Sequence, residues 1–129
     1  MARRRGVAAA AALVVLGVTL THELLTPTPF HHARSTGVFV LAAVIAVALL
    51  ALAPRVPSAG VALGAGIAAG GALGTLVSGI AWNGVPDPLV LGGIAFNVSD
   101  LAIGLGDAIL VAAALLHGWV HRADLRRPV

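Results

Sequence analysis

Two aspartates separated by a short loop are the residues of this chain best suited to chemistry. Asp87 and Asp100 flank a segment rich in Gly and Pro, in a sequence that is otherwise almost entirely hydrocarbon. A carboxylate beside a bilayer is costly, so a pair of them next to membrane segments is expected to have a function. Two carboxyl groups that share one proton and hold a water are the apparatus of an aspartic peptidase. We therefore consider Asp87 and Asp100 first as a catalytic pair.

The residues around each aspartate indicate how it is presented. Asp100 follows Asn97 and Ser99, which are both good N-cap residues, and the first turn of a helix favours an ionised carboxylate. Asp87 is framed by two prolines, in Pro86–Pro88, so it sits in a stiff turn. Asp100 is then the better candidate for the ionised partner. The alternative is that both are solvated residues of an ordinary turn and an ordinary helix start.

Composition places these residues in an integral membrane protein with a single domain, residues 1–129. The chain is 59% hydrophobic and only 10% charged, whereas a soluble domain is about 25% charged. Apolar runs able to cross about 30 Å of hydrocarbon as helices occupy 6–25, 37–53, 60–82 and 101–120. We predict an all-α bundle of four transmembrane helices. There is no cysteine, so disulfides and thiolate metal sites are excluded, and no metal or cofactor is expected.

The arginines predict how the bundle is oriented. They precede the first apolar run, lie between the second and third, and follow the fourth, while only Arg34 lies on the other side. Positively charged loops face the cytoplasm, so both termini are expected there, with Asp87 and Asp100 on the outer face of the cell membrane. This placement also explains the excess of basic over acidic residues without a nucleic-acid partner. No small-x-small cleavage site follows the first run, which is therefore expected to stay as a helix.

The third apolar run carries glycines at a regular spacing. Gly66, Gly70 and Gly74 repeat every four residues and therefore share one helix face. Such a seam lets a neighbouring backbone approach closely. We expect it to fix the position of Ser78 and of the loop that follows.

Three segments resemble motifs of the signal peptidase II family, the lipoprotein signal peptidases. The family pattern Gly-Gly-Ala-x-Gly is similar to Gly70–Gly74, its Val-Asp-Phe segment to Val85–Pro88, and its Phe-Asn-x-Ala-Asp-Ser-Ala-Ile to Phe96–Ile103. The resemblance implies a four-helix membrane aspartic endopeptidase that cleaves prolipoproteins before a lipid-modified cysteine. It implies Asp87 and Asp100 as the catalytic dyad and Asn97 as a supporting residue. The lipid bilayer and a lipid-modified prolipoprotein are then the expected partners.

The chain departs from the family pattern around this dyad. The family has Asn-x-x-Asp-Arg where this chain has Thr75–Gly79, so charge-assisted hydrogen bonds that orient the site are lost. Thr75 and Ser78 are the residues available to replace them. A family motif of the type Asp-Gln-x-x-Lys is replaced by Thr21–Leu25, in which Glu23 is a possible additional acid. The outer loop, Thr26–Thr36, is shorter than the substrate-cradling sheet of family members requires.

One more acid lies deeper in the membrane. Asp107 follows Asp100 by seven residues, so it is on nearly the same helix face and about 10 Å further in. An acid at such a depth is usually functional or paired. It is expected to meet Ser78 or Thr75, to stay protonated, or to line a path for protons or ions.

The sequence therefore favours a membrane aspartic endopeptidase of signal peptidase II type that uses Asp87 and Asp100. Because the Asn-x-x-Asp-Arg cluster is lost, an alternative is a related protein that binds lipoproteins without cleaving them. A small four-helix transporter that couples to protons through Glu23 or Asp107 is the third possibility. Substitution of the dyad separates the first from the other two.

Overall fold

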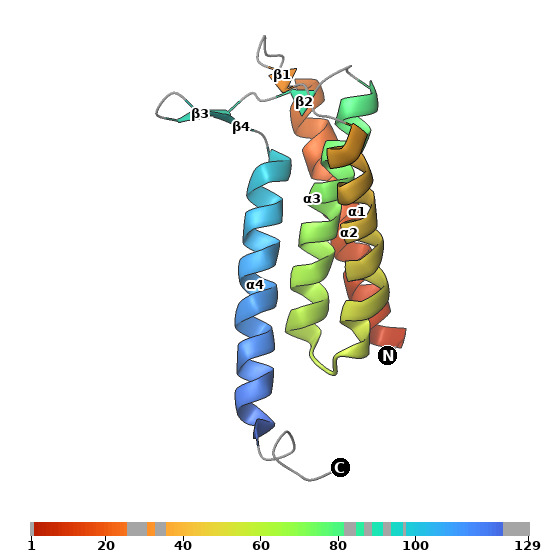
Figure 1. Cartoon of the computed structure of the whole chain (residues 1–129), viewed down its shortest axis with the longest axis vertical. Helices are drawn as coiled ribbons and strands as arrows, with labels where there is room; N and C mark the ends of the chain where they lie inside the picture. The colour runs from red at the N-terminus through yellow and green to blue at the C-terminus, as the bar shows by residue number, and fades with distance from the viewer. Residues whose placement is uncertain are drawn as a thin grey trace.

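The computed structural model describes residues 2–25, 31–32, 36–81, 85–86, 89–91, 94–96 and 98–122. Most of the described chain is helical. The α-helices are α1 (Ala2–Leu25), α2 (Thr36–Leu52), α3 (Ala59–Ala81) and α4 (Val98–Val120), and a short 3-10 helix, η1 (Ala53–Arg55), follows α2. Figure 1 shows the four α-helices running side by side along the long axis of the molecule.

The length and composition of these helices suit a bilayer. Helices α1, α3 and α4 are long and apolar enough to cross a membrane, while α2, with 17 residues, is also apolar but shorter. A helix satisfies all its backbone hydrogen bonds internally, which a segment in hydrocarbon requires. Many large apolar side chains, such as Leu13, Val47 and Leu115, are exposed on the outside of the bundle. The predicted bundle of apolar membrane helices is confirmed, and the crossing of the bilayer by all four helices stays a prediction.

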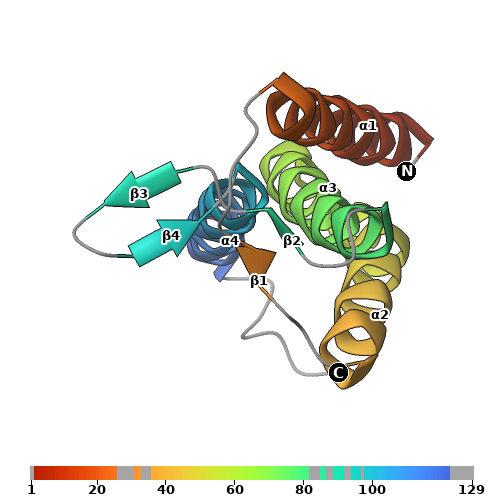
Figure 2. The ribbon, with the colours of Figure 1, turned by 90° about the horizontal axis from the view of Figure 1, so that it is seen from above.

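Helix α3 is the centre of the bundle. Seen from above, it lies between the other three helices, which surround it on different sides (Figure 2). It packs most extensively against α4 and α1 and also against α2, whereas α2 and α4 scarcely contact each other over their described lengths. The core along α3 is made of small residues, among them Ala62, Ala65 and Ala69, which are fully buried.

Glycines on two faces of α3 explain this close packing. A Cβ atom added at Gly70 would lie 2.6 Å from the carbonyl oxygen of Ala12, and one at Gly66 would collide with the carbonyl oxygen of Ala8. The predicted seam is therefore confirmed, and it packs on α1. On the opposite side, a Cβ at Gly64 would lie 2.8 Å from the carbonyl oxygen of Gly106, so α3 and α4 also meet backbone to backbone.

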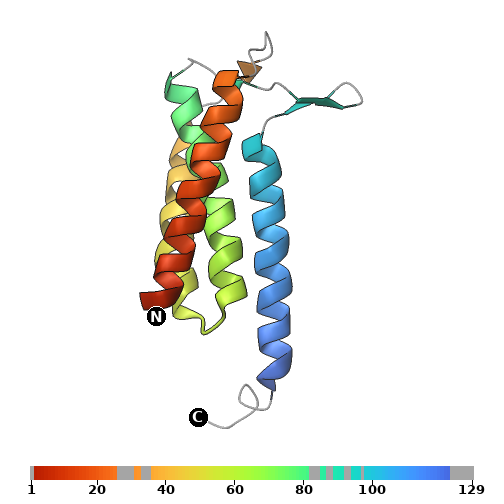
Figure 3. The same ribbon diagram turned by 180° about the vertical axis from the view of Figure 1, so that it is seen from behind.

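Five arginines of the described residues gather at one end of the bundle: Arg3, Arg4, Arg5, Arg55 and Arg122. The start of α1, the turn between α2 and α3, and the end of α4 lie at the same end (Figure 3). The Arg4 Nε donates a hydrogen bond of 2.8 Å to the carbonyl oxygen of Pro54, which ties α1 to that turn. At the end of α4, the Arg122 guanidinium lies 4.3 Å from the centre of the Trp119 ring. Arg55 belongs to η1 at the same end.

The opposite end carries short strands that the sequence analysis did not expect. They are β1 (His31–His32), β2 (Val85–Pro86), β3 (Leu89–Leu91) and β4 (Ile94–Phe96). Strand β1 pairs antiparallel with β2, and β3 with β4. The hairpin of β3 and β4 projects away from α1, α2 and α3 (Figures 1 and 2). Strand β1, between α1 and α2 in the sequence, therefore pairs with the segment that leads to Asp87.

Candidate functional site

Asp100 is the member of the predicted dyad that the structure describes. It lies in the first turn of α4, as the preceding N-cap residues predicted, and its side chain is half-buried. Asp87 and Asn97 lie outside the described residues, although Asp87 directly follows β2 in the sequence. The pairing of the two carboxyl groups therefore stays a prediction.

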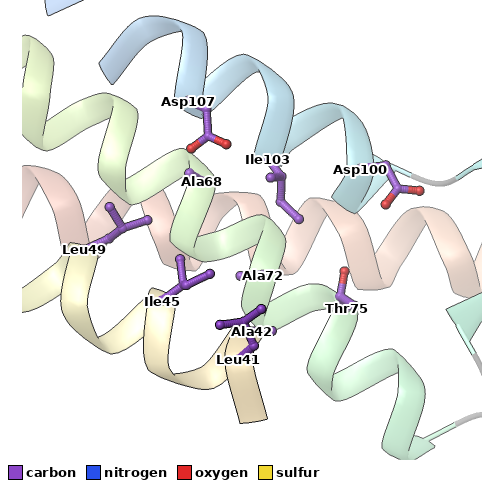
Figure 4. A pocket seen from close by; sticks show the side chains of 10 residues that line it. All are labelled: Leu41, Ala42, Ile45, Leu49, Ala68, Ala72, Thr75, Asp100, Ile103 and Asp107. Atoms are coloured by element: carbon purple, nitrogen blue, oxygen red, sulfur yellow. The ribbon is translucent and has the colours of Figure 1, made fainter. Parts of the chain in front are cut away.

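Asp100 lines a cavity of about 230 Å³ between α2, α3 and α4. Figure 4 shows its walls, with leucine and isoleucine side chains of α2 on one side and residues of α4 on the other. Most of the lining is apolar, and the polar residues are Thr75, Asp100 and Asp107. Because α2 and α4 scarcely touch, the cavity lies where the bundle is least closed. An apolar segment with a few polar groups is the kind of ligand that such walls accept.

Thr75 supplies a hydroxyl to this cavity from α3. Its side chain is only 4% exposed, and its Oγ1 atom has no hydrogen-bond partner among the described residues. A buried hydroxyl without a partner is costly, so native structures seldom keep one without a reason. In Figure 4 the Thr75 hydroxyl points toward the α4 side of the cavity.

Ser78 and Glu23 form a second polar group on a different face of α3. The Ser78 hydroxyl donates a short hydrogen bond to Oε2 of Glu23, which belongs to α1. Ser78 is fully buried and Glu23 is 4% exposed. One turn further in, Gly74 lets the helices approach, since a Cβ there would lie 2.7 Å from the Ser99 Oγ of α4. Glu23 is thus held inside the protein by the packing of α1 on α3.

The structure separates Thr75 and Ser78, two of the three residues predicted to support the dyad. Thr75 shares a cavity with Asp100, whereas Ser78 bonds to Glu23 between α1 and α3. Asp107 was expected to meet Thr75 or Ser78. It lines the same cavity as Thr75, whereas Ser78 bonds to Glu23 and not to Asp107. The predicted roles of Ser78, Thr75, Glu23 and Asp107 in catalysis stay predictions.

An aromatic contact that the sequence analysis missed explains one departure from the family pattern. Gly79 stands where the pattern has arginine, and the Phe39 ring of α2 covers it so closely that a Cβ at Gly79 would collide with the ring. The space that a side chain at this position needs is therefore filled by Phe39. Nothing in the spacing along α2 indicated this contact, because Phe39 is one apolar residue among many in that helix.

The comparisons with known proteins agree with the motifs. A family model described as signal peptidase (SPase) II matches residues 8–116, from the second turn of α1 to near the end of α4. No curated protein and no solved structure matches the chain. The match covers most of the chain and includes Asp87, Asn97 and Asp100. The chain therefore belongs to the signal peptidase II family.

Proposed function

We propose that this protein is a membrane aspartic endopeptidase that cleaves signal peptides from lipid-modified prolipoproteins. Its membership of the signal peptidase II family supports a lipoprotein signal peptidase role. The observation that carries the proposal is the position of Asp100, at a helix start and on the wall of an apolar cavity. A signal peptide is an apolar segment with a cleavage site at its outer end. Such a substrate would place its hydrocarbon against the cavity and its scissile bond near Asp100.

In the proposed mechanism, Asp87 and Asp100 divide the work of peptide hydrolysis. Asp100, ionised at the start of α4, takes a proton from a water that attacks the scissile carbonyl carbon. Asp87, protonated, donates a hydrogen bond to the carbonyl oxygen and stabilises the tetrahedral intermediate. Transfer of a proton to the amide nitrogen then breaks the C–N bond. Asn97 lies three residues before Asp100 and is proposed to orient the pair.

The proposed setting is the cell membrane, which all four helices cross. Arg4, Arg55 and Arg122 lie at the same end of the bundle, and the helix start that carries Asp100 lies at the other. Positive residues favour the cytoplasmic side. This arrangement supports cytoplasmic termini and an active site on the outer face, where prolipoproteins would be cleaved.

Charge-neutral substitutions test the proposed dyad. We expect Asp87→Asn and Asp100→Asn each to abolish cleavage of a lipid-modified prolipoprotein by the purified protein in lipid. Asp124→Asn is the matched control, since Asp124 lies beyond the residues that match the family, and it should cleave at the parent rate. Cleavage at the parent rate by either dyad variant would exclude the proposed mechanism.

One observation favours a second candidate, a family member that binds prolipoproteins without cleaving them. The ring of Phe39 covers Gly79, at the position of the family's arginine, so the charged support of the site is replaced by an aromatic contact. If the unmodified protein retains uncleaved prolipoprotein through purification and releases no product during long incubation, the binding role is correct and the enzyme role is wrong.

A further inference from the structure

We infer that Asp107 selects substrates, by accepting a hydrogen bond from a polar side chain within the apolar part of the signal peptide. This inference rests on the proposed function, and it assigns to that site a residue that the dyad mechanism does not use.

Asp107 lies near the middle of α4, where a carboxyl group is most costly. The helix has 23 residues and Asp107 is the tenth, so about 13 Å of helix separates it from the outer end. Its side chain is exposed rather than packed inside the protein. Among the described residues, no hydrogen bond or ion pair involves its carboxyl group. An intramembrane acid usually faces a partner, so a partner from outside the fold is expected.

The cavity that Asp107 lines contains a second polar group without a hydrogen-bond partner among the described residues. The Thr75 hydroxyl is buried and has no partner among the described residues, and it points into the cavity that Asp107 lines (Figure 4). The remaining lining includes Leu41, Ile45 and Ile103. Leu41 and Ile45 are 58% and 44% exposed, so the α2 wall is open to the surroundings. The site therefore combines hydrocarbon contact with two hydrogen-bonding groups in addition to Asp100.

The size of the cavity favours part of a long ligand over a whole small molecule. Its volume of about 230 Å³ is below the range of roughly 300–1,000 Å³ that is typical of pockets for small molecules. A cavity of this size accepts a few side chains of a segment that lies across it. A second cavity of about 260 Å³, between α1, α3 and α4, has only apolar residues in its lining. That cavity offers a control of similar size without an acid.

The depth of Asp107 predicts which substrate residue it meets. Seven residues separate Asp107 from Asp100, which is about 10 Å along the helix and nearly the same face. A signal peptide whose scissile bond is at Asp100 would bring a residue about seven positions earlier to this depth if it is helical. If it is extended, the residue is about three positions earlier. A carboxyl group accepts a hydrogen bond in either protonation state, so a hydroxyl or amide there would be favoured over a hydrocarbon side chain.

The first test is a substrate scan with isosteric residues. A lipid-modified prolipoprotein with an all-aliphatic signal segment is prepared with single Val or Thr residues at each of the third to eighth positions before the scissile bond. We expect the parent protein to cleave the Thr substrate about tenfold faster than the Val substrate at one or two adjacent positions. Asp107→Leu should reduce this ratio to about one, and Asp107→Asn should retain part of it because its amide oxygen still accepts a hydrogen bond.

A matched variant controls for the possibility that a larger side chain anywhere on α4 alters cleavage. Ala112→Leu changes an exposed residue of the same helix that does not line the cavity, and it should keep the Thr preference of the parent. Equal Thr-to-Val ratios in the parent and in Asp107→Leu, with normal cleavage of both substrates, would overturn the inference and leave the proposed function intact.

Cross-linking tests the same inference without requiring cleavage. The chain has no cysteine, so Ile45→Cys places one thiol on the wall of the cavity, and Leu105→Cys places one in the all-apolar cavity as the control. The substrate carries a scanned cysteine in its signal segment, since its own lipid-modified cysteine is blocked. We expect disulfide formation with Ile45→Cys near the position of greatest Thr preference. If the substrate cross-links to Leu105→Cys and not to Ile45→Cys, the inference is wrong. If it cross-links to Ile45→Cys but the parent protein never cleaves it, the inference is supported and the endopeptidase function is excluded.

Discussion

The two polar faces of α3 differ in how closely the helices pack around their polar groups. On the face toward α1, Ser78 donates its hydrogen bond to Glu23, and glycines bring the two helix backbones into contact. On the face toward α2 and α4, Thr75 has no partner among the described residues and opens onto a cavity with Asp100 and Asp107. Ser78, Glu23 and Thr75 are buried, whereas Asp100 is half-buried and Asp107 is exposed. The first face is closed by helix packing, which also buries the Thr19 hydroxyl without a partner among the described residues, while the second face opens onto the cavity.

This difference indicates which polar residues serve the structure and which are available for a substrate. A polar group in a membrane protein must be satisfied by the protein, by water or by a ligand. The contact of Glu23 with Ser78 contributes to the association of α1 with α3. Around the cavity, Ala42 and Leu49 of α2 pack against a core cluster that includes Ala72 of α3, but no described residue bonds to the Thr75 hydroxyl or to the Asp107 carboxyl group. Substitutions on the closed face should therefore affect folding, and those of the polar residues on the open face should affect substrate handling.

The largest expected effect is on the closed face, at Gly70. A Cβ there would lie 2.6 Å from the carbonyl oxygen of Ala12, so Gly70→Leu must push α1 away from α3. We expect the free energy of unfolding to fall by about 3 kcal/mol or more, as overpacking of a tight interface predicts. Unfolding by SDS in mixed micelles measures it. Gly104→Leu is the control, since a Cβ at Gly104 meets nothing within 4 Å. A similar loss in both variants would contradict the distinction between the faces.

A smaller loss is expected where α2 meets α3, at Gly79. Arginine at this position must displace the Phe39 ring, which now covers the glycine. We expect Gly79→Arg to lower the free energy of unfolding by about 2 kcal/mol. Because the ring is the obstacle, Phe39→Ala combined with Gly79→Arg should lose less than the sum of the two single variants, measured in the same SDS titration. Strict additivity would show that Phe39 does not explain the missing arginine.

The sequence predicted the helical architecture and the position of Asp100 but not the partners of the polar residues. The length of the apolar runs and the scarcity of charge are sufficient to predict membrane helices, because a single segment in hydrocarbon satisfies its backbone hydrogen bonds only as a helix. The spacing of Gly66, Gly70 and Gly74 predicted a close interface, although not that α1 would occupy it. The contacts of Ser78 with Glu23 and of Phe39 with Gly79 depend on the rotation of each helix about its axis. Uniformly apolar helices carry little information about that rotation.

The short strands could not be predicted from the sequence either, for a different reason. Strands β1 and β2 have two residues each, too few for an alternating pattern to be recognised. Their pairing joins segments more than 50 residues apart, which a local pattern does not reveal. The strands matter to the site because β2 leads directly into Asp87.

The third prediction concerns the hydrogen bond that closes the α1 face. Ser78→Ala removes the donor to Glu23, so we expect the free energy of unfolding to fall by about 1–2 kcal/mol. Asp107→Asn on the open face should leave it unchanged, since no described residue bonds to that carboxyl group. A double-mutant cycle of Ser78→Ala with Glu23→Gln isolates the energy of the pair. No coupling between the two sites would show that the contact does not stabilise the bundle.

The smallest effect on stability, and the clearest separation of the two faces, is expected at Thr75. Thr75→Val keeps the shape of the side chain and removes a buried hydroxyl that has no partner among the described residues. The free energy of unfolding should therefore stay the same or rise by up to about 1 kcal/mol, because the cost of burying the hydroxyl disappears. Cleavage of a prolipoprotein should nevertheless slow by a few-fold, since the cavity loses a group that can bond to the substrate. Thr75→Ser retains the hydroxyl and should keep most of the parent rate. A marked loss of stability in Thr75→Val, with unchanged cleavage, would instead assign Thr75 to the structural side and erase the contrast with Ser78.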